Sequence, residues 1–384
     1  MRQQTEQELI DRVLAHLAAG TTDLAPAPGQ AAAAEYIDPM RHEQERAVLF
    51  RRQPIAVAPI AALPRPGDFL TVDDYGLPLL ATRDKQGRAH VFLNACRHRG
   101  TRLVSAPHGK NRPSFVCPYH AWTYANDGAL LKVNHPACFP DLKQEEHGLI
   151  ELPAGEAAGF LWALLTPEAG GDPAGAVAQS LGALLPELAA LELGQAAVYE
   201  PYERLWRANW KILVEGGLEA YHFRVVHRDS IYPLFHDNLM LHDRFGAHQR
   251  LVLPKRSISE LGGVPREQWR LRKHANLVYL LYPNLMLLVQ QDHVVAVHIY
   301  PTAAAESRIV ITMLVPEAPT SEKTAAHWAR NRAITLSALD EDFAVGEKVD
   351  TGLRAGLIDR VTFGRNELGL TAFHESLAKS LSGG

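Results

Sequence analysis

The order of apolar and polar positions divides the 384 residues into a β-rich first half and a mixed second half. From about residue 50 to residue 166, short apolar runs alternate with Pro, Gly and Asp clusters, a pattern typical of a small antiparallel β domain. The runs are PIAVAPI, DFLTVDD, LPLLATR, HVFLNA and FLWALL. Residues 1–45 predict a helix followed by an Ala- and Pro-rich connector. Residues 167–176, PEAGGDPAGA, predict a linker.

The second half predicts helices around an antiparallel sheet. We expect helical residues at about 175–195, a strand at AVYEPYERLWR, and a long helix that begins near Asn209. Four β-rich runs then follow in close succession, NLVYLLYP, NLMLLVQQ, HVVAVHIYP and SRIVITMLVP. A last helix is predicted from Ser321 to about Gly346, with a Ser/Thr cap at its start. The expected organisation is therefore residues 1–45, 46–166 and 167–384.

Composition places the chain among ordinary globular proteins and excludes several partners. Hydrophobic residues make up 47% of the chain and charged residues 21%, and the net charge is −4. Because the sequence has no Lys- and Arg-rich stripe, we expect neither a nucleic acid nor an anionic membrane as a partner. We see no signal peptide and no apolar run of membrane-spanning length. Three cysteines, an odd number, fit a reducing cytoplasm.

The most specific motif joins two cysteines and two histidines. Cys96 and His98 lie in NACRHRG, and Cys117 and His120 lie in CPYHAWTY. Each arm supplies one thiolate and one imidazole, as a Rieske two-iron two-sulfur cluster requires, with both thiolates on one iron and both imidazoles on the other. A structural zinc site is the alternative, but zinc fingers usually place both cysteines before both histidines. The order of the residues favours the cluster.

A second metal-binding constellation lies in NWKILVEGGLEAYHFRVVH. It contains Glu219, His222 and His227, and two histidines with one carboxylate form the facial triad of non-haem iron oxygenases. Five residues span about 140° on an ideal helix, so we expect the helix to end, or to contain a π-type turn, between the two histidines. The sequence leaves the third ligand open, because the LDEDF segment from Leu339 to Phe343 also offers three consecutive acids.

From about residue 50 to residue 352, the chain resembles the α subunits of Rieske non-haem iron oxygenases, the aromatic-ring-hydroxylating dioxygenases. The likeness rests on PGDFLTV, NACRHRGTRL, FVCPYHAWTYANDGAL, NWK, the Glu-x-x-His-x4-His run, YPNLML and EDFAVGEKVDTGL. The resemblance implies an α+β fold, with an N-terminal antiparallel β Rieske domain and a C-terminal catalytic domain of helix-grip type, an antiparallel sheet covered by helices. The N-terminal residues would pack on the catalytic domain.

The same resemblance assigns roles to particular residues. His222, His227 and Asp342 would bind mononuclear ferrous iron, and Cys96, His98, Cys117 and His120 would bind the cluster. Glu219 would be the bridging acid that links a Rieske histidine of one subunit to an iron ligand of the next, within a homotrimer.

Two positions depart from the usual family pattern. Glu219 replaces a frequent Asp, and Gly216 replaces a frequent Asn. The Glu-x-x-x-Glu-x-Tyr-His spacing is similar to that of the branch that oxidises quaternary amines. Tyr202, Trp206 and Tyr221 could form a cage for such a cation, although packing is the commoner role of aromatic residues. Phe235, Leu239, Phe245 and Leu287 are candidates for the pocket wall or for plain core.

The chain lacks the G-x-G-x-x-G motif of a nicotinamide or flavin domain. We therefore expect a terminal oxygenase that uses O2 and electrons from a separate NAD(P)H-dependent reductase, with or without a ferredoxin. Its substrate would be a small aromatic compound or quaternary amine that is hydroxylated or demethylated. The alternatives are an electron-transfer protein and a non-catalytic binding protein that keeps the Rieske fold.

Overall fold

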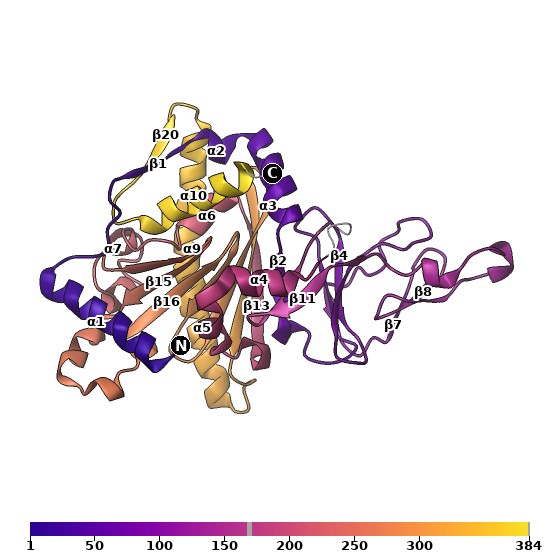
Figure 1. The fold of residues 1–384 in the computed structure, drawn as a ribbon, viewed down its shortest axis with the longest axis horizontal. Helices are drawn as coiled ribbons and strands as arrows, with labels where there is room; N and C mark the ends of the chain where they lie inside the picture. The colour runs from indigo at the N-terminus through magenta and orange to yellow at the C-terminus, as the bar shows by residue number, and fades with distance from the viewer. Residues whose placement is uncertain (167–170, 383–384) are drawn as a thin grey trace. The chain divides into compact units, whose positions relative to one another are not determined.

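The computed structural model describes residues 1–166 and 171–382, which form two compact units (Figure 1). Arg46–Gln179 and Glu192–Gln195 form one, called here the β unit. Met1–Glu45, Ser180–Leu191 and Ala196–Gly384 form the other, the sheet–helix unit. Among the described residues, no helix is both long enough and apolar enough to cross a bilayer.

The β unit consists of three small antiparallel sheets. Their strand orders are β10-β5-β4-β3-β6, β11-β12-β2 and β7-β8-β9. The five apolar runs of the sequence form β2, β3, β4, β5 and β12, because each supplies buried side chains to the unit. The strands are β2 (Ile55–Pro59), β3 (Phe69–Val72), β4 (Leu79–Arg83), β5 (Ala89–Leu93), β6 (His108–Gly109), β7 (Ser114–Val116), β8 (Thr123–Ala125), β9 (Leu130–Lys132), β10 (Glu151–Leu152), β11 (Ala154–Ala157) and β12 (Phe160–Ala163).

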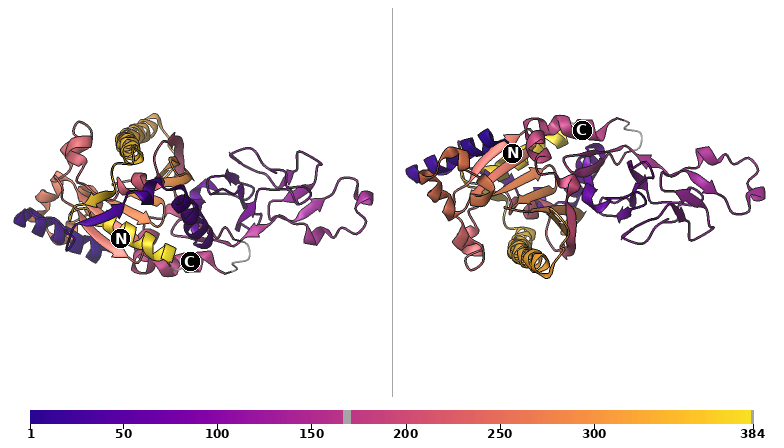
Figure 2. Two further views of the ribbon diagram at one scale, coloured as in Figure 1. Left: turned by 90° about the horizontal axis from the view of Figure 1, so that it is seen from above. Right: turned by 90° about the horizontal axis from the view of Figure 1, so that it is seen from below.

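The sheet–helix unit is built on a seven-stranded antiparallel sheet of order β13-β19-β18-β17-β16-β15-β14. The five expected β-rich runs form β13 (Ala197–Trp206), β16 (Ala275–Leu281), β17 (Leu285–Val289), β18 (Val294–Ala303) and β19 (Glu306–Val315). The other two strands, β14 (Leu241–Phe245) and β15 (His248–Pro254), were not predicted. All seven residues of β15 are buried, because helices cover the sheet. Figure 1 shows α9 (Glu322–Arg354) running along the sheet, and Figure 2 shows the same helix nearly end-on.

The helix predicted from Ser321 is α9, and its cap is confirmed. The Ser321 hydroxyl accepts a hydrogen bond from the Thr324 backbone N–H at 3.2 Å, and the Thr324 hydroxyl accepts one from the Ser321 N–H at 3.1 Å. This reciprocal pair satisfies two of the donors that a helix start leaves open.

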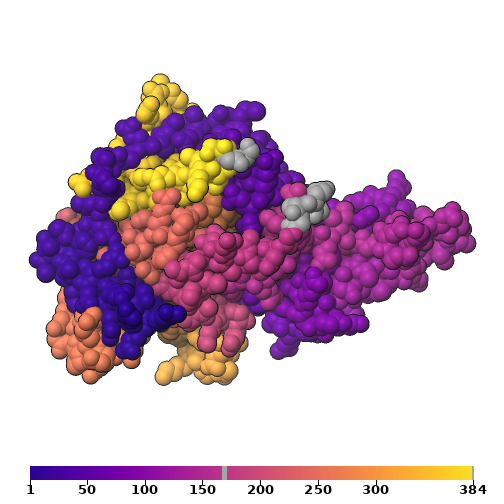
Figure 3. Space-filling view, viewed as in Figure 1, coloured from indigo at the N-terminus to yellow at the C-terminus, as the bar shows by residue number. Residues whose placement is uncertain are grey.

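The N-terminal connector contains regular elements that the sequence did not predict. After α1 (Gln3–Ala19), β1 (Gly29–Ala32) pairs with β20 (Arg360–Phe363), and α2 (Ala34–Ile37) and α3 (Pro39–Arg52) follow. Pairing with a strand more than 300 residues away, which local sequence does not reveal, orders this segment. In Figure 3 the indigo N-terminal residues lie beside the yellow helix α10 (Leu368–Ser382).

Two further expectations need correction. Residues 167–170 of the predicted linker lie outside the described residues, and its end belongs to the helix α4 (Pro173–Leu181), where Pro173 suits a first helical position. The prediction of a long helix from Asn209 is also wrong, because α6 (Trp210–Glu215) ends at Gly216-Gly217. A second short helix, α7 (Phe223–Val226), follows it.

Candidate metal centres

In the β unit, two loops of the same construction hold the Cys and His residues. The Cys96 N–H donates to the Thr101 carbonyl at 2.8 Å, and the Gly100 N–H returns to the Cys96 carbonyl at 2.8 Å. In the second loop, the Cys117 N–H donates to the Trp122 carbonyl, also at 2.8 Å. Both loops turn through a positive φ at the fourth residue after the cysteine, 73° at Gly100 and 58° at Ala121.

These loops bring the four predicted cluster residues together. The Nδ1 atoms of His98 and His120 lie 3.1 Å apart, a distance that two ligands of one tetrahedral iron can occupy. Cys96 and Cys117 are both buried. Burial raises the pKa of the Cys96 thiol, and the neighbouring Cys117 thiol acts in the same direction. Such thiols are poor free nucleophiles, but a metal deprotonates its thiol ligands, so the site fits a cluster.

Aromatic rings enclose the histidine side of this site. The ring of His98 stacks on Trp122 with centroids 4.9 Å apart and an interplanar angle of 12°. The ring of His120 stacks on Tyr119 at 3.7 Å, and Tyr119 is 54% exposed. The Tyr124 hydroxyl lies 3.3 Å from the Cys96 sulfur. Hydrogen bonds to sulfur ligands help to set the reduction potential of such clusters, so Tyr124 would influence the potential of a cluster bound here.

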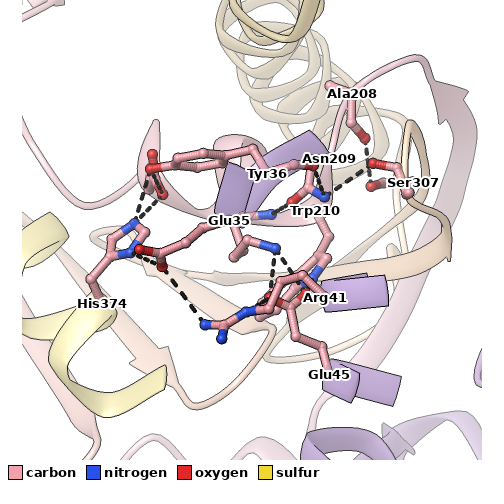
Figure 4. A network of polar contacts seen from close by, with 12 residues as sticks. Glu35, Tyr36, Arg41, Glu45, Ala208, Asn209, Trp210, Ser307 and His374 are labelled. Carbon is pink, nitrogen blue, oxygen red and sulfur yellow. Dashed lines mark hydrogen bonds and ion pairs between the residues drawn. The ribbon is translucent and has the colours of Figure 1, made fainter. Parts of the chain in front are cut away.

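In the sheet–helix unit, the NWK motif fixes the start of α6. The Asn209 side chain accepts the N–H of Lys211 at 3.0 Å and donates to the Tyr36 carbonyl at 2.8 Å. The Trp210 ring N–H donates to a Glu45 oxygen at 2.9 Å, and the Lys211 ammonium contacts both Glu45 oxygens at 2.8 Å. The motif thus anchors α6 on the N-terminal segment (Figure 4).

A second cluster in Figure 4 fixes the end of α6. His374 contacts Glu215 through Nε2 at 2.8 Å and Glu35 through Nδ1 at 3.2 Å, and the Tyr36 hydroxyl donates to Glu215 at 2.9 Å. Burial lowers the pKa of His374, but the hydrogen bonds to its two carboxylates outweigh burial and raise the pKa to about 9. His374 is therefore an imidazolium at neutral pH, which links α10, α6 and the N-terminal segment.

The helix that begins at Trp210 ends before His222, and the second helix, α7, ends at Val226, between the two histidines. His222 is the N-cap of α7 and His227 is its C-cap, so a single helical turn separates them. The π-type turn is not present in this segment. The predicted angular conflict is removed because both residues lie at the ends of the turn, where the backbone is free to aim their rings toward a common point.

Asp342 on α9 completes the group. Its Oδ1 lies 2.9 Å from Nε2 of His227 and 3.2 Å from Nε2 of His222, and the two Nε2 atoms are 3.2 Å apart. Ligands that bind a metal at about 2.1 Å and at right angles are about 3 Å from one another. The three donor atoms therefore have the spacing that binding to one metal ion requires.

Two carboxylates contact the Nδ1 atoms of these imidazoles, the ring nitrogens that do not face the triad. Glu219 Oε1 contacts Nδ1 of His222, and its Oε2 accepts the backbone N–H groups of Tyr221 and His222. Glu341 Oε2 lies 2.6 Å from Nδ1 of His227 and also accepts the Ser230 hydroxyl. Each carboxylate fixes a tautomer that leaves Nε2 free for a metal. The pKa of His222 is lowered by burial, but bonds to Asp342 and Glu219 raise it to about 10.

The sequence alone did not identify the role of Glu341. Its only signal is the run Asp340-Glu341-Asp342, of which two members face the site, while Asp340 lies 3.8 Å from Arg204. A run of adjacent acids on a helix does not show which members point inward, since successive residues are about 100° apart.

A cavity of about 290 Å³ opens at the triad. Gly216 and Gly217 line it beside Glu219, His222 and His227. A Cβ atom at Gly217 would lie 1.9 Å from the Met286 methyl, so the end of the Met286 side chain would have to move to admit a larger residue there. At Gly216 the nearest atom to a Cβ is 3.9 Å away, so a side chain has room at this position.

Most of the residues that the sequence suggested for the pocket wall or for a cation cage do not line this cavity. Phe235 lines the cavity, whereas Leu239, Phe245 and Leu287 are not among its described lining residues. The same holds for Tyr202, Trp206 and Tyr221, so the proposed cation cage is wrong for this cavity. Strand β13 places Tyr202 and Trp206 outside the cavity, and Tyr221 is 63% exposed.

Comparisons with known proteins agree with this geometry. Residues 53–145 match the Rieske [2Fe-2S] domain, and residues 189–383 match the ring hydroxylating alpha subunit (catalytic domain). The chain is 33% identical over 199 residues to the glycine betaine monooxygenase oxygenase subunit of Chromohalobacter salexigens. It is 30% identical over 205 residues to the anthranilate 1,2-dioxygenase large subunit of Acinetobacter baylyi. Each aligned segment covers 52% of this chain and 43% of the relative.

Solved structures share the fold over nearly the whole chain. The quaternary ammonium Rieske monooxygenase CntA with L-carnitine has a TM-score of 0.76 at 20% identity, with coverage of 93% of this chain and 96% of that one. Naphthalene 1,2-dioxygenase from Rhodococcus sp. also gives 0.76, at 19% identity and 98% coverage of both chains.

The chain therefore has the fold of a Rieske-type oxygenase component. It belongs to the family of ring-hydroxylating α subunits, and its two parts are a Rieske [2Fe-2S] domain and a catalytic domain of the kind that binds mononuclear iron. The predicted fold class is confirmed.

Proposed function

We propose that this protein is the terminal oxygenase component of a Rieske system, which inserts oxygen from O2 into a small organic substrate. The observation that supports this most strongly is the convergence of His222, His227 and Asp342 at the wall of a cavity. An electron carrier needs neither the triad nor the cavity. In this proposal, Cys96, His98, Cys117 and His120 hold the cluster.

Bound iron would supply oxygen activation, and the chain's own residues prepare the site for it. Glu219 and Glu341 each accept a hydrogen bond from Nδ1 of one histidine, which orients both rings with Nε2 aimed at the metal position. Leu213, Phe223 and Phe343 line the cavity, and their apolar side chains would limit the access of water to the metal position. Because three protein donors occupy one face of the site, O2 and substrate can approach from the other.

Glu219 is proposed to be the bridging acid between subunits of a homotrimer. Its side chain is only 10% exposed, and both oxygens already accept hydrogen bonds within the chain. A carboxylate offers about four acceptor positions, so Glu219 can accept one further N–H, from His120 of the partner subunit. Electrons would enter from a separate NAD(P)H-dependent reductase, with or without a ferredoxin.

Three measurements test the proposal. Purified protein should contain three iron atoms per chain, and reduction should give the spin-resonance spectrum of a Rieske cluster. Oxygen uptake with a surrogate reductase should depend on added substrate and should match the product formed. Two iron atoms per chain without substrate-dependent uptake would indicate an electron carrier or a binding protein instead.

A further inference from the structure

The cavity has a polar end opposite the metal triad. Four strand ends of the sheet meet there, and they supply Lys255 after β15, Asn276 in β16, Gln290 after β17 and His293 before β18. The register places Asn276 beside Leu253, and Gln290 N–H donates to the His293 carbonyl at 2.9 Å. These side chains therefore form one row across neighbouring strands.

The separation of this row from the triad follows from the elements that line the cavity. Along β17, Met286 approaches Gly217 near the triad, and Gln290 lies four residues further, about 13 Å at strand rise. Along α9, the lining runs from Asp342 at the triad to Asn331, about 16 Å at helical rise. The cavity is thus elongated, with a metal-binding end and a polar end.

Lys255 is the only lysine or arginine among the described residues that line this cavity. No ion pair or side-chain hydrogen bond of its ammonium group occurs within the described parts of the chain. The two carboxylates in the lining, Glu219 and Asp342, are both bound to the triad histidines. Burial lowers the pKa of Lys255, and Asp292 opposes this only through its charge. A half-buried cation without a partner costs stability unless a ligand compensates it.

The neighbours of Lys255 also have unused hydrogen-bonding capacity. His293 is 4% exposed, its Nδ1 lies 2.8 Å from Asp292, and its Nε2 is buried without a partner among the described residues. The Asn276 Oδ1 is likewise buried and unpartnered. The amides of Asn276 and Gln290 can present NH2 groups to an anion, while His293 Nε2 can accept a hydrogen bond from a hydroxyl or amino group.

From these observations we infer that the substrate is an organic carboxylate, and that Lys255 binds its carboxylate group while Asn276 and Gln290 donate hydrogen bonds to it. This inference rests on the proposed function and names the substrate class of the same site. The apolar body of the substrate would lie between the polar row and the triad, against residues such as Val278, Leu288 and Ile334. Aromatic acids and betaines both carry this group, and the experiment separates them.

The experiment is anaerobic calorimetric titration of the whole protein with two matched pairs of probes. Benzoate is compared with benzamide, and glycine betaine with choline, because within each pair only one member carries a carboxylate. We expect at least one acid to bind tenfold or more tightly than its partner, since a charge-assisted hydrogen bond contributes about 1.5–3 kcal/mol. The pair that shows this difference identifies the body of the substrate.

Three variants assign the effect to one residue. Lys255→Met should weaken binding of the preferred acid about 10- to 150-fold. The affinity for the other member of the pair, which has no carboxylate, should stay unchanged. Lys255→Arg should retain part of the preference. Lys273→Met, which removes an equal charge at an exposed position nearby, should change neither affinity. Iron content and the cluster spectrum report whether each variant is folded.

Equal affinity within both pairs, including no binding by either member, overturns the inference, as does unchanged acid binding by Lys255→Met. The result is independent of turnover. Acid binding through Lys255 without substrate-dependent oxygen uptake would refute the proposed function alone. Oxygen uptake with choline or benzamide at full rate would support an oxygenase and refute the role of Lys255.

Discussion

Replacing Lys211 by Met should destabilise the sheet–helix unit by about 3 kcal/mol. Lys211 and Glu45 are both fully buried, and the ammonium contacts both carboxylate oxygens at 2.8 Å. Removing one member of a buried ion pair typically costs about 3–5 kcal/mol, because the other charge remains buried. We expect the lower end of this range, since Glu45 keeps hydrogen bonds from Arg41 at 3.1 Å and Trp210 at 2.9 Å.

The assay is urea unfolding followed by two signals. Tryptophan fluorescence reports mainly on the sheet–helix unit, and absorbance of the cluster reports on the β unit, whose midpoint should not change. Lys323→Met, at an exposed position of α9, is the matched control and should stay within about 0.5 kcal/mol of the parent. Replacing both partners, Lys211→Met with Glu45→Leu, should restore part of the loss.

Two results would refute this reasoning. A loss below about 1 kcal/mol for Lys211→Met would mean that the pair is not an important anchor of α6. A double variant whose loss equals the sum of the two single losses would mean that the two residues do not interact energetically, since coupling appears as non-additivity.

The remaining predictions concern the metal site and its support. Glu219→Gln should keep both iron centres, measured by metal analysis and spin resonance, but lose most turnover, and normal product formation would contradict a bridging role. Glu341→Gln should weaken binding of the mononuclear iron about 10- to 100-fold in a metal titration, because it removes the acceptor of His227, while unchanged affinity would contradict that role. The raised pKa of His374 predicts that its stabilising contribution is complete below pH 6.5 and is lost as the pH rises through about 9. It amounts to at most about 3 kcal/mol. His374→Leu should flatten the pH dependence of unfolding in this interval, and a parental profile would contradict this.

The sequence predicts best those features that depend on neighbouring residues. Ten of the strands follow from short apolar runs, namely β2, β3, β4, β5, β12, β13 and β16 to β19, and the cap of α9 follows from Ser321 and Thr324. Within each loop of the first site, the cysteine and the histidine are held close together because the loop closes through backbone bonds between residues four or five apart. Such short-range constraints can be read directly from spacing.

Features that depend on distant contacts were predicted poorly. The regular structure of residues 29–37 depends on pairing with residues 360–363, and the attachment of α6 to the N-terminal segment depends on Glu45. Asp342 could be selected only from the family resemblance, because a helix carrying three adjacent acids gives no local sign of which one faces a ligand. The helix at residues 209–227 was predicted as too long because Gly216-Gly217 allows the chain to turn away toward the cavity.

The pairing of β1 with β20 has a consequence for synthesis of the protein on the ribosome. Gly29 pairs with Phe363, so the first of these strands is made 334 positions before its partner. At about 5–20 residues per second, the early strand waits roughly 15 to 70 seconds with an unsatisfied edge. The Rieske domain, whose contacts are mainly within its own stretch of sequence, can fold during that interval. Slow translation or a shortage of chaperones should therefore impair the sheet–helix unit first.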